Sequence, residues 1–280
     1  MNTMSDPYRE TEGYGAQVYY RPDSGAHIVA PPLDDEELTS DAIDALPRPT
    51  PLQAVRMRDR IEAVRTYVAE NGGTHSVMGW VEGPAAEAAD VRGVENFFAD
   101  LLLEPERIGD LMDVCNQVAL PFAKEQIDLG ADTIGIGDAV ASQVSQDVYE
   151  RLILPREQWL VREIKAYKPE AHTRVRLHIC GNITHLLPGI STLGIDIVDV
   201  DHMVDMEYAR SVLGTATALA GNIDPVAGVL RGTPELIRQK MRETYEKVGN
   251  PFMANAGCEI PSGTPKENLL ALCEPIAWQA

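Results

Sequence analysis

The chain has 280 residues, of which 44% are hydrophobic and 24% charged, and its formal net charge is −19 at pH 7. This composition is typical of a globular protein with enough apolar material for a sizeable core. The negative charge argues against nucleic acid or an anionic membrane as a partner, because both are bound through basic patches.

Residues 1–50 are polar and interrupted by proline, which predicts an irregular N-terminal lead-in with one short strand near 17–20. Residues 51–280 show a regular alternation of helix and strand patterns, and we expect them to form a single domain. The predicted order is helix 52–71, strand 76–81, helices 93–103 and 105–129, strand 133–136, helix 145–167, strand 175–180, helix 183–192, strand 195–200, helix 206–212, strand 216–221, helix 233–248, strand 252–256 and helix 265–273.

Strands that alternate with helices indicate βα units and a parallel sheet. Polar residues follow the strands, and in a (β/α)8 barrel the carboxyl ends of the strands form the active-site face. We expect one rim to carry Glu82, Asp138, Asp201, Asn222, Asp224 and Glu259. A Rossmann-like sheet is the alternative, but no G-x-G-x-x-G or Walker sequence opens a helix. The fold class is therefore α/β, a TIM (β/α)8-type barrel, although only six of its eight strands are predicted.

A metal site is predicted from His178 and Cys180, which stand at i and i+2 of an apolar run and so share one face of a strand. Cys258 near the end of a later strand would complete a set of one nitrogen and two sulfurs. That set suits Zn²⁺ with a fourth position free, as in catalytic zinc sites. The alternative is a hydrogen-bonded interior histidine beside two small buried cysteines.

The remaining cysteines and histidines give weaker signals. The four cysteines are too scattered for a disulfide framework, and the N-terminus has neither a secretory signal nor an apolar run long enough to span a membrane. These features favour a cytoplasmic protein. Cys115 and Cys273 fall in predicted helices and are expected in the core. Surface or loop positions are expected for His172, His185 and His202.

Three segments together resemble the uroporphyrinogen decarboxylase superfamily: His178-Ile-Cys-Gly-Asn182, Ala220-Gly-Asn-Ile-Asp-Pro225 and Asn255-Ala-Gly-Cys-Glu-Ile-Pro261. The H-x-C…C pattern resembles its zinc-dependent corrinoid branch, the methylcobalamin:coenzyme M type methyltransferases. The resemblance implies a TIM barrel with zinc on His178, Cys180 and Cys258. It places Asp201 at the fourth position, where a Glu is common. Members begin with a segment that supplies the first two barrel strands, so we expect this chain to be N-terminally truncated and to lack one or two strands.

The function implied by the resemblance is zinc-dependent transfer of a methyl group. The donor would be a methyl-corrinoid on a separate corrinoid protein, and the acceptor a small molecule, either a coenzyme M-like thiol or tetrahydrofolate. Asp138, Asn222 and Asp224 are candidates for orienting the substrate or the zinc ligands; hydrogen bonding at the barrel rim is the alternative for them. Two rival functions remain open: a metal-independent carboxy-lyase of the uroporphyrinogen decarboxylase type, and a non-catalytic or inactive truncated zinc protein.

Overall fold

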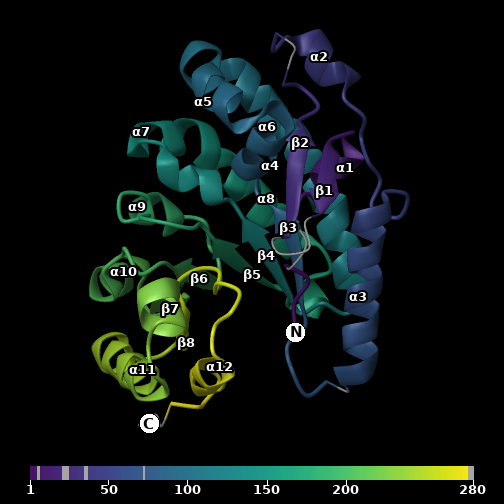
Figure 1. Ribbon diagram of the computed structural model, residues 1–280. Helices are drawn as coiled ribbons and strands as arrows, with labels where there is room; N and C mark the ends of the chain where they lie inside the picture. Colours follow the sequence, from purple (N-terminus) through teal and green to yellow (C-terminus); the bar gives the residue numbers. More distant parts are fainter. Residues whose placement is uncertain (5–6, 21–24, 35–36, 72, 277–280) are drawn as a thin grey trace. The chain divides into compact units, whose positions relative to one another are not determined.

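The computed structural model describes residues 1–4, 7–20, 25–34, 37–71 and 73–276, and the chain divides into two compact units. Unit 1 consists of residues 1–141 and 147–175, and unit 2 of residues 142–146 and 176–280. Each unit combines parallel strands with helices, so the α/β class predicted from the sequence is confirmed (Figure 1). The domain boundary expected near residue 50 lies inside unit 1 and stays a prediction.

The first 50 residues contain more regular structure than expected. The short strand predicted at 17–20 is β1 (Gln17–Tyr20), and it pairs antiparallel with β2 (Ala26–Ala30), which was not predicted. Two short helices were also not predicted, α1 (Arg9–Gly13) and α2 (Ser40–Ala45). The side chain of Thr39 caps α2 by accepting a hydrogen bond from the Ala42 N–H, a common way to satisfy the first turn of a helix.

The rest of unit 1 places helices around two parallel strands. The strands are β3 (Met78–Glu82) and β4 (Thr133–Gly137), followed by the start of β5 (Arg174–His178). The α-helices are α3 (Val55–Asn71), α4 (Pro84–Arg92), α5 (Val94–Leu103), α6 (Pro105–Asp128) and α8 (Leu154–Ala166). The shorter helical elements of unit 1 are η2 (Tyr149–Ile153) and η3 (Pro169–Ala171). Two more, η1 (Ala139–Gln143) and α7 (Gln146–Val148), contain residues of both units.

Helix α6 is the central helix of unit 1, because it packs against β3 and against α3, α4, α5 and α8. Its buried Gln126 donates to the Trp80 carbonyl at 3.0 Å and accepts from the Trp80 N–H at 3.0 Å. An amide side chain thus satisfies backbone groups of β3 that would otherwise be buried without a partner. The Trp80 ring lies over β4 at Gly135, where a Cβ atom would come within 2.2 Å of Trp80 Cε3.

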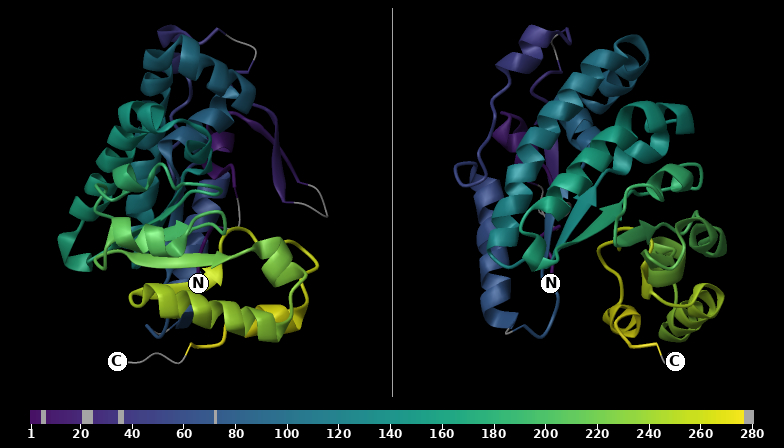
Figure 2. Two further views of the ribbon diagram at one scale, coloured as in Figure 1. Left: turned by 90° about the vertical axis from the view of Figure 1, so that its left-hand side faces the viewer. Right: turned by 180° about the vertical axis from the view of Figure 1, so that it is seen from behind.

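Unit 2 contains four parallel strands in chain order. The last residues of β5 pair with β6 (Ile197–Val200), β6 with β7 (Ala218–Ile223) and β7 with β8 (Phe252–Ala256). The helical elements are α9 (Leu187–Ile190), α10 (Met206–Leu213), η4 (Pro225–Leu230), α11 (Pro234–Val248) and α12 (Lys266–Leu272). Helices α11 and α12 pack on each other and on β8, as Figure 2 shows. The six strands β3 to β8 correspond to the six that the sequence predicts.

One apolar cluster in the core of unit 2 is formed by buried side chains of β7, η4, α11, β8 and α12. Within the described part of the chain, no helix combines the length and apolar character needed to cross a membrane.

Candidate metal centre

Three side chains predicted to bind a metal come together in unit 2. His178 ends β5, Cys180 follows two residues later, and Cys258 follows β8. His178 Nε2 lies 3.1 Å from Cys180 Sγ, and Cys180 Sγ lies 2.9 Å from Cys258 Sγ. One ligand atom from each of the three residues lies within 4.8 Å of the other two. The three donor atoms are therefore close enough to share one ion.

A glycine allows the segment that carries Cys258 to approach the loop after β6. A Cβ atom at Gly257 would lie 2.6 Å from the backbone nitrogen of His202 and 2.8 Å from Asp201 Oδ1. The Gly257 N–H donates to the Ile223 carbonyl at 2.8 Å, which continues the β7–β8 ladder beyond β8. The close packing of the Gly257 backbone against the loop after β6 therefore fixes the backbone position of the next residue, Cys258.

The electrostatics of the cluster favour a thiolate. Hydrogen bonds from Cys180 and His178 lower the pKa of Cys258 to about 4, whereas the hydrogen bond to Cys258 and burial raise the pKa of Cys180. Burial alone would lower the pKa of His178, but its hydrogen bonds with Asp199 and Cys258 raise it to about 9. A half-buried set of one imidazole and two sulfurs that already stabilises a thiolate has the donor chemistry that Zn²⁺ prefers.

Asp201, the expected fourth ligand, is not one of these converging side chains. Its buried carboxylate accepts hydrogen bonds from the Gly181 N–H at 2.7 Å, from the His202 N–H at 2.6 Å and from His202 Nδ1 at 2.6 Å. These bonds hold the loop after Cys180 against the loop after β6. Metal binding by Asp201 stays a prediction.

Asn222 and Asp224 lie at the end of β7, as expected. Asn222 Nδ2 donates to the Val204 carbonyl at 3.0 Å, and Asn222 also lines a polar pocket of about 310 Å³ together with His202. Asp224 Oδ1 accepts from the N–H groups of Val226 and Ala227, both at 2.8 Å, and so caps η4. These contacts hold the loop, and the catalytic roles of both residues stay predictions.

Asp138 and Glu82 belong to unit 1, where they follow β4 and β3. Asp138 is fully buried and accepts hydrogen bonds from Ala86 N at 2.6 Å and Ala85 N at 3.4 Å, at the start of α4. Burial raises the pKa of Asp138 to about 6 and that of Glu82 to about 7. Glu82 also forms an ion pair of 3.0 Å with the buried Arg9. The hydrogen bonds of Asp138 stabilise the turn into α4, and a catalytic role for it stays a prediction.

The other predicted side chains fall in mixed environments. Cys115 is buried, as expected, but Cys273 is exposed, so its predicted place in the core is wrong. Cys273 is the C-cap of α12, so it lies beyond the helical turns that pack against the rest of the unit. His172 and His202 are exposed, and His185 is half-buried with its Nε2 2.9 Å from the Val144 carbonyl oxygen. Glu259, one residue after Cys258, is exposed.

Two charged residues beside the cluster were not identified from the sequence. Asp199 Oδ2 lies 2.9 Å from His178 Nδ1, and Arg176 Nε and Nη2 contact the same carboxylate at distances from 2.6 to 3.0 Å. The available signal was the presence of charged residues inside two otherwise apolar strands, because a buried charge normally has a partner.

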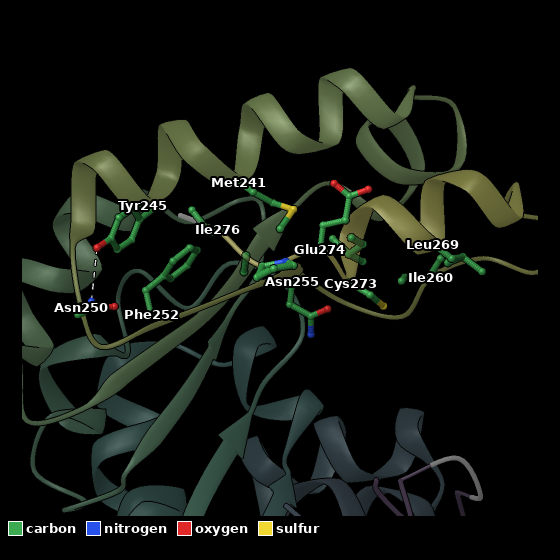
Figure 3. A pocket seen from close by; sticks show the side chains of 13 residues that line it. Met241, Tyr245, Asn250, Phe252, Asn255, Ile260, Leu269, Cys273, Glu274 and Ile276 are labelled. Carbon is green, nitrogen blue, oxygen red and sulfur yellow. Dashed lines mark hydrogen bonds between the residues drawn. The ribbon is translucent and has the colours of Figure 1, made fainter. Parts of the chain in front are cut away.

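A pocket of about 760 Å³ lies elsewhere in unit 2, between α11, β8 and α12 (Figure 3). Its lining is mainly apolar, with Met241, Phe252 and Leu269 among the lining residues, and Tyr245 and Asn250 are hydrogen-bonded at one end. None of the three cluster residues lines this pocket.

Comparison with known proteins supplies the family context. The family model for uroporphyrinogen decarboxylase (URO-D) matches residues 2–277. The methylcobamide:CoM methyltransferase MtbA of Methanosarcina acetivorans is 32% identical over 216 residues, which cover 76% of this chain and 61% of that protein. The uroporphyrinogen decarboxylase of Microcystis aeruginosa is 31% identical over 246 residues, which cover 85% of this chain and 68% of that protein.

A solved structure shares the fold. A methyltransferase from Methanosarcina mazei superposes with a TM-score of 0.83 at 23% identity, over 97% of this chain and 78% of that one. The chain thus spans between three fifths and four fifths of the length of these relatives. The likeness confirms the predicted TIM-like fold class, and the relatives by sequence are enzymes, either methyltransferases or decarboxylases.

Proposed function

The chain belongs to the uroporphyrinogen decarboxylase (URO-D) family, and from this premise we propose that it is a zinc-dependent methyltransferase. It moves a methyl group from a methyl-corrinoid, carried by a partner corrinoid protein, to a coenzyme M-like thiol or to tetrahydrofolate. The observation that carries the proposal is the convergence of His178 Nε2, Cys180 Sγ and Cys258 Sγ. The similarity to methylcobamide:CoM methyltransferases supports the same function.

The three residues would hold the metal through one neutral nitrogen and two thiolates. Two thiolates offset the charge of a divalent ion, and three protein ligands leave room for a substrate atom, as in catalytic zinc sites. When bound, Zn²⁺ would supply a deprotonated, nucleophilic thiolate at neutral pH from a thiol whose ordinary pKa is about 8.5. The chain's own residues orient the donor atoms and pack the loops around them, with Gly257 and the Asp201 hydrogen bonds setting the approach of those loops.

The rival function is metal-independent decarboxylation of a porphyrinogen, which the similarity to uroporphyrinogen decarboxylases supports. A decarboxylase has no need of a converging set of imidazole and thiolates. The cluster therefore favours methyl transfer between these two activities of the family.

The test combines metal analysis with an activity assay on the full chain. Wild type is expected to bind one zinc ion per chain and to transfer the methyl group of methylcobalamin to a thiol, followed by the change in cobalamin absorbance. Cys258→Ser is expected to lose most of its bound zinc and its thiol-dependent activity while keeping its fold by circular dichroism. Cys273→Ser is the matched control, because Cys273 is exposed in the same unit and is not part of the cluster.

Zinc content that is equal in wild type and Cys258→Ser would contradict the proposed site. Porphyrinogen decarboxylation that persists in metal-depleted Cys258→Ser would establish the rival function instead. A protein that binds zinc at this site but catalyses neither reaction would be a non-catalytic zinc protein.

A further inference from the structure

Two charged side chains lie behind His178, on the strands that carry the cluster. In the β5–β6 pairing, His178 is directly opposite Asp199, and Arg176 precedes His178 by two residues on β5. Side chains at i and i+2 of a strand share a face, so Arg176 and His178 both reach Asp199 on the neighbouring strand. Asp199 is only 7% exposed, although its charge would favour contact with water.

The contact between Asp199 and His178 decides which ring nitrogen faces the cysteines. Asp199 Oδ2 lies 2.9 Å from Nδ1, while Nε2 lies 3.1 Å from Cys180 Sγ. An ionised carboxylate only accepts hydrogen bonds, so Nδ1 carries the proton in this contact. A neutral imidazole that donates from Nδ1 presents the lone pair of Nε2, which is the atom available to a metal.

Arg176 fixes Asp199 in turn. Its Nε lies 2.9 Å from Oδ1 and 3.0 Å from Oδ2, and its Nη2 lies 2.6 Å from Oδ1. The forked geometry of a guanidinium allows it to bind a carboxylate through two nitrogens and to hold the carboxylate in one plane. Asp199 therefore has a counter-charge on one side and the histidine on the other.

We propose that Asp199 and Arg176 form a positioning pair that holds His178 with Nε2 toward Cys180 and so raises the metal affinity of the cluster. The inference rests on the proposed zinc-dependent function, and it assigns roles to two residues outside the three ligands. Carboxylates that orient metal-binding histidines typically change metal affinity 10–100-fold when they are replaced. A plain ion pair between two strands would change stability and leave zinc affinity as it is.

The experiment compares Asp199→Asn and Arg176→Lys with wild type. The matched control is Asp100→Asn, because Asp100 and Arg92 form another partly buried ion pair, 2.6 Å long, in unit 1. Zinc affinity is measured by competition with a chromophoric chelator. Asp199→Asn is expected to bind zinc about 10–100-fold more weakly. Arg176→Lys, which keeps the charge but loses the fork, is expected to be weakened by a smaller factor, and the control is expected to stay within about twofold of wild type.

Proton NMR of ¹⁵N-histidine-labelled, metal-depleted protein supplies a second measurement. A downfield, slowly exchanging Nδ1–H resonance of His178 is expected in wild type and in the control, and its loss is expected in Asp199→Asn. This signal reports the hydrogen bond itself, so a loss of stability alone would not remove it. If Asp199→Asn fails to fold, Arg176→Lys decides through its zinc affinity.

The outcomes separate the inference from the function on which it rests. A wild-type protein that binds no zinc would refute the proposed function, while the NMR signal would still show whether Asp199 orients His178. Zinc binding by wild type that is unchanged in Asp199→Asn and Arg176→Lys would refute the positioning role and leave the zinc site intact.

Discussion

The side chain of Glu157 on α8 is fully buried. Two substitutions, Glu157→Gln and Glu157→Ala, distinguish the effect of losing its ionisable group from the effect of losing its hydrogen bonds. Tyr149 donates its hydroxyl to Glu157 Oε2 at 2.5 Å, and Glu157 also contacts the carboxylate of Asp138. Burial first, and then the neighbouring Asp138 carboxylate, raise the pKa of Glu157 well above 4.5. Its raised pKa favours the protonated form of Glu157 in the folded protein, in which the side chain acts as a neutral hydrogen-bonding group.

Glu157→Gln keeps the shape and both hydrogen bonds, because the amide accepts from Tyr149 and donates to Asp138. Its cost in the free energy of unfolding at neutral pH is expected to be below about 1 kcal/mol. Glu157→Ala leaves the Tyr149 hydroxyl and the Asp138 carboxylate without this partner, at about 1–3 kcal/mol each, and removes one methylene worth about 0.8 kcal/mol. The expected cost of the alanine variant is about 4 kcal/mol.

Urea unfolding followed by circular dichroism at several pH values tests the reasoning. Because folding raises the pKa of Glu157, its proton stabilises the folded protein fully below the ordinary pKa of 4.5. That contribution is lost as the pH rises through the raised pKa. The glutamine variant has no such loss, so its stability relative to wild type is expected to improve as the pH rises.

The control is Glu163→Gln on the same helix, where the half-exposed side chain is expected to change stability by less than about 0.5 kcal/mol. Two results would refute the account of Glu157. One is a glutamine variant as unstable as the alanine variant at neutral pH. The other is an equal pH dependence in wild type and Glu157→Gln, since either result would mean that Glu157 is ionised in the folded protein.

Two further predictions concern packing and helix capping. Gly135→Ala is expected to lower the free energy of unfolding by about 2 kcal/mol, because the new Cβ atom would lie 2.2 Å from Trp80 Cε3 in a buried contact. Gly25→Ala, where the new methyl group meets open space, is the control in the same urea titration. Asp205→Ala is expected to lower the free energy of unfolding by about 1 kcal/mol, because Asp205 Oδ1 accepts a hydrogen bond from the Tyr208 N–H at 2.8 Å at the start of α10. Asp205→Asn should retain most of this stabilisation, and equal losses of stability in both variants would contradict the capping role.

The sequence determined the order and type of the main elements with few errors. Glycine and proline at element ends and the 3.6- and 2-residue periods predicted α3, α6, α11 and the six parallel strands close to their observed bounds. Helix α4 was missed, because Pro84–Arg92 is buried on nearly every side and so lacks the amphipathic period that identifies a surface helix. Helices α1 and α2 were missed because five and six residues are too few to show a 3.6-residue period, and strand β2 was missed as well.

Part of the candidate site was also predictable. The two-residue period of a strand predicts that His178 and Cys180 share a face, and this needs no knowledge of any other segment. Cys258 is a candidate partner from its residue type and its place near the end of a later strand, and the resemblance to a family supports that choice, because 78 residues separate Cys258 from Cys180 along the chain. Local sequence carries no information on contacts of that range.

Only the tertiary structure decided which groups surround the cluster. The contact of Asp199 with His178 depends on the register of β5 against β6, and a shift of one residue would turn Asp199 to the opposite face of the sheet. Asp138 and Asp201 each follow a strand and are buried, yet Asp138 accepts a hydrogen bond from the start of α4, whereas Asp201 accepts hydrogen bonds from Gly181 and His202. A sequence pattern identifies the strand end at which a carboxylate lies, but the packing of neighbouring elements decides whether that carboxylate faces a reacting group, a backbone amide or another side chain.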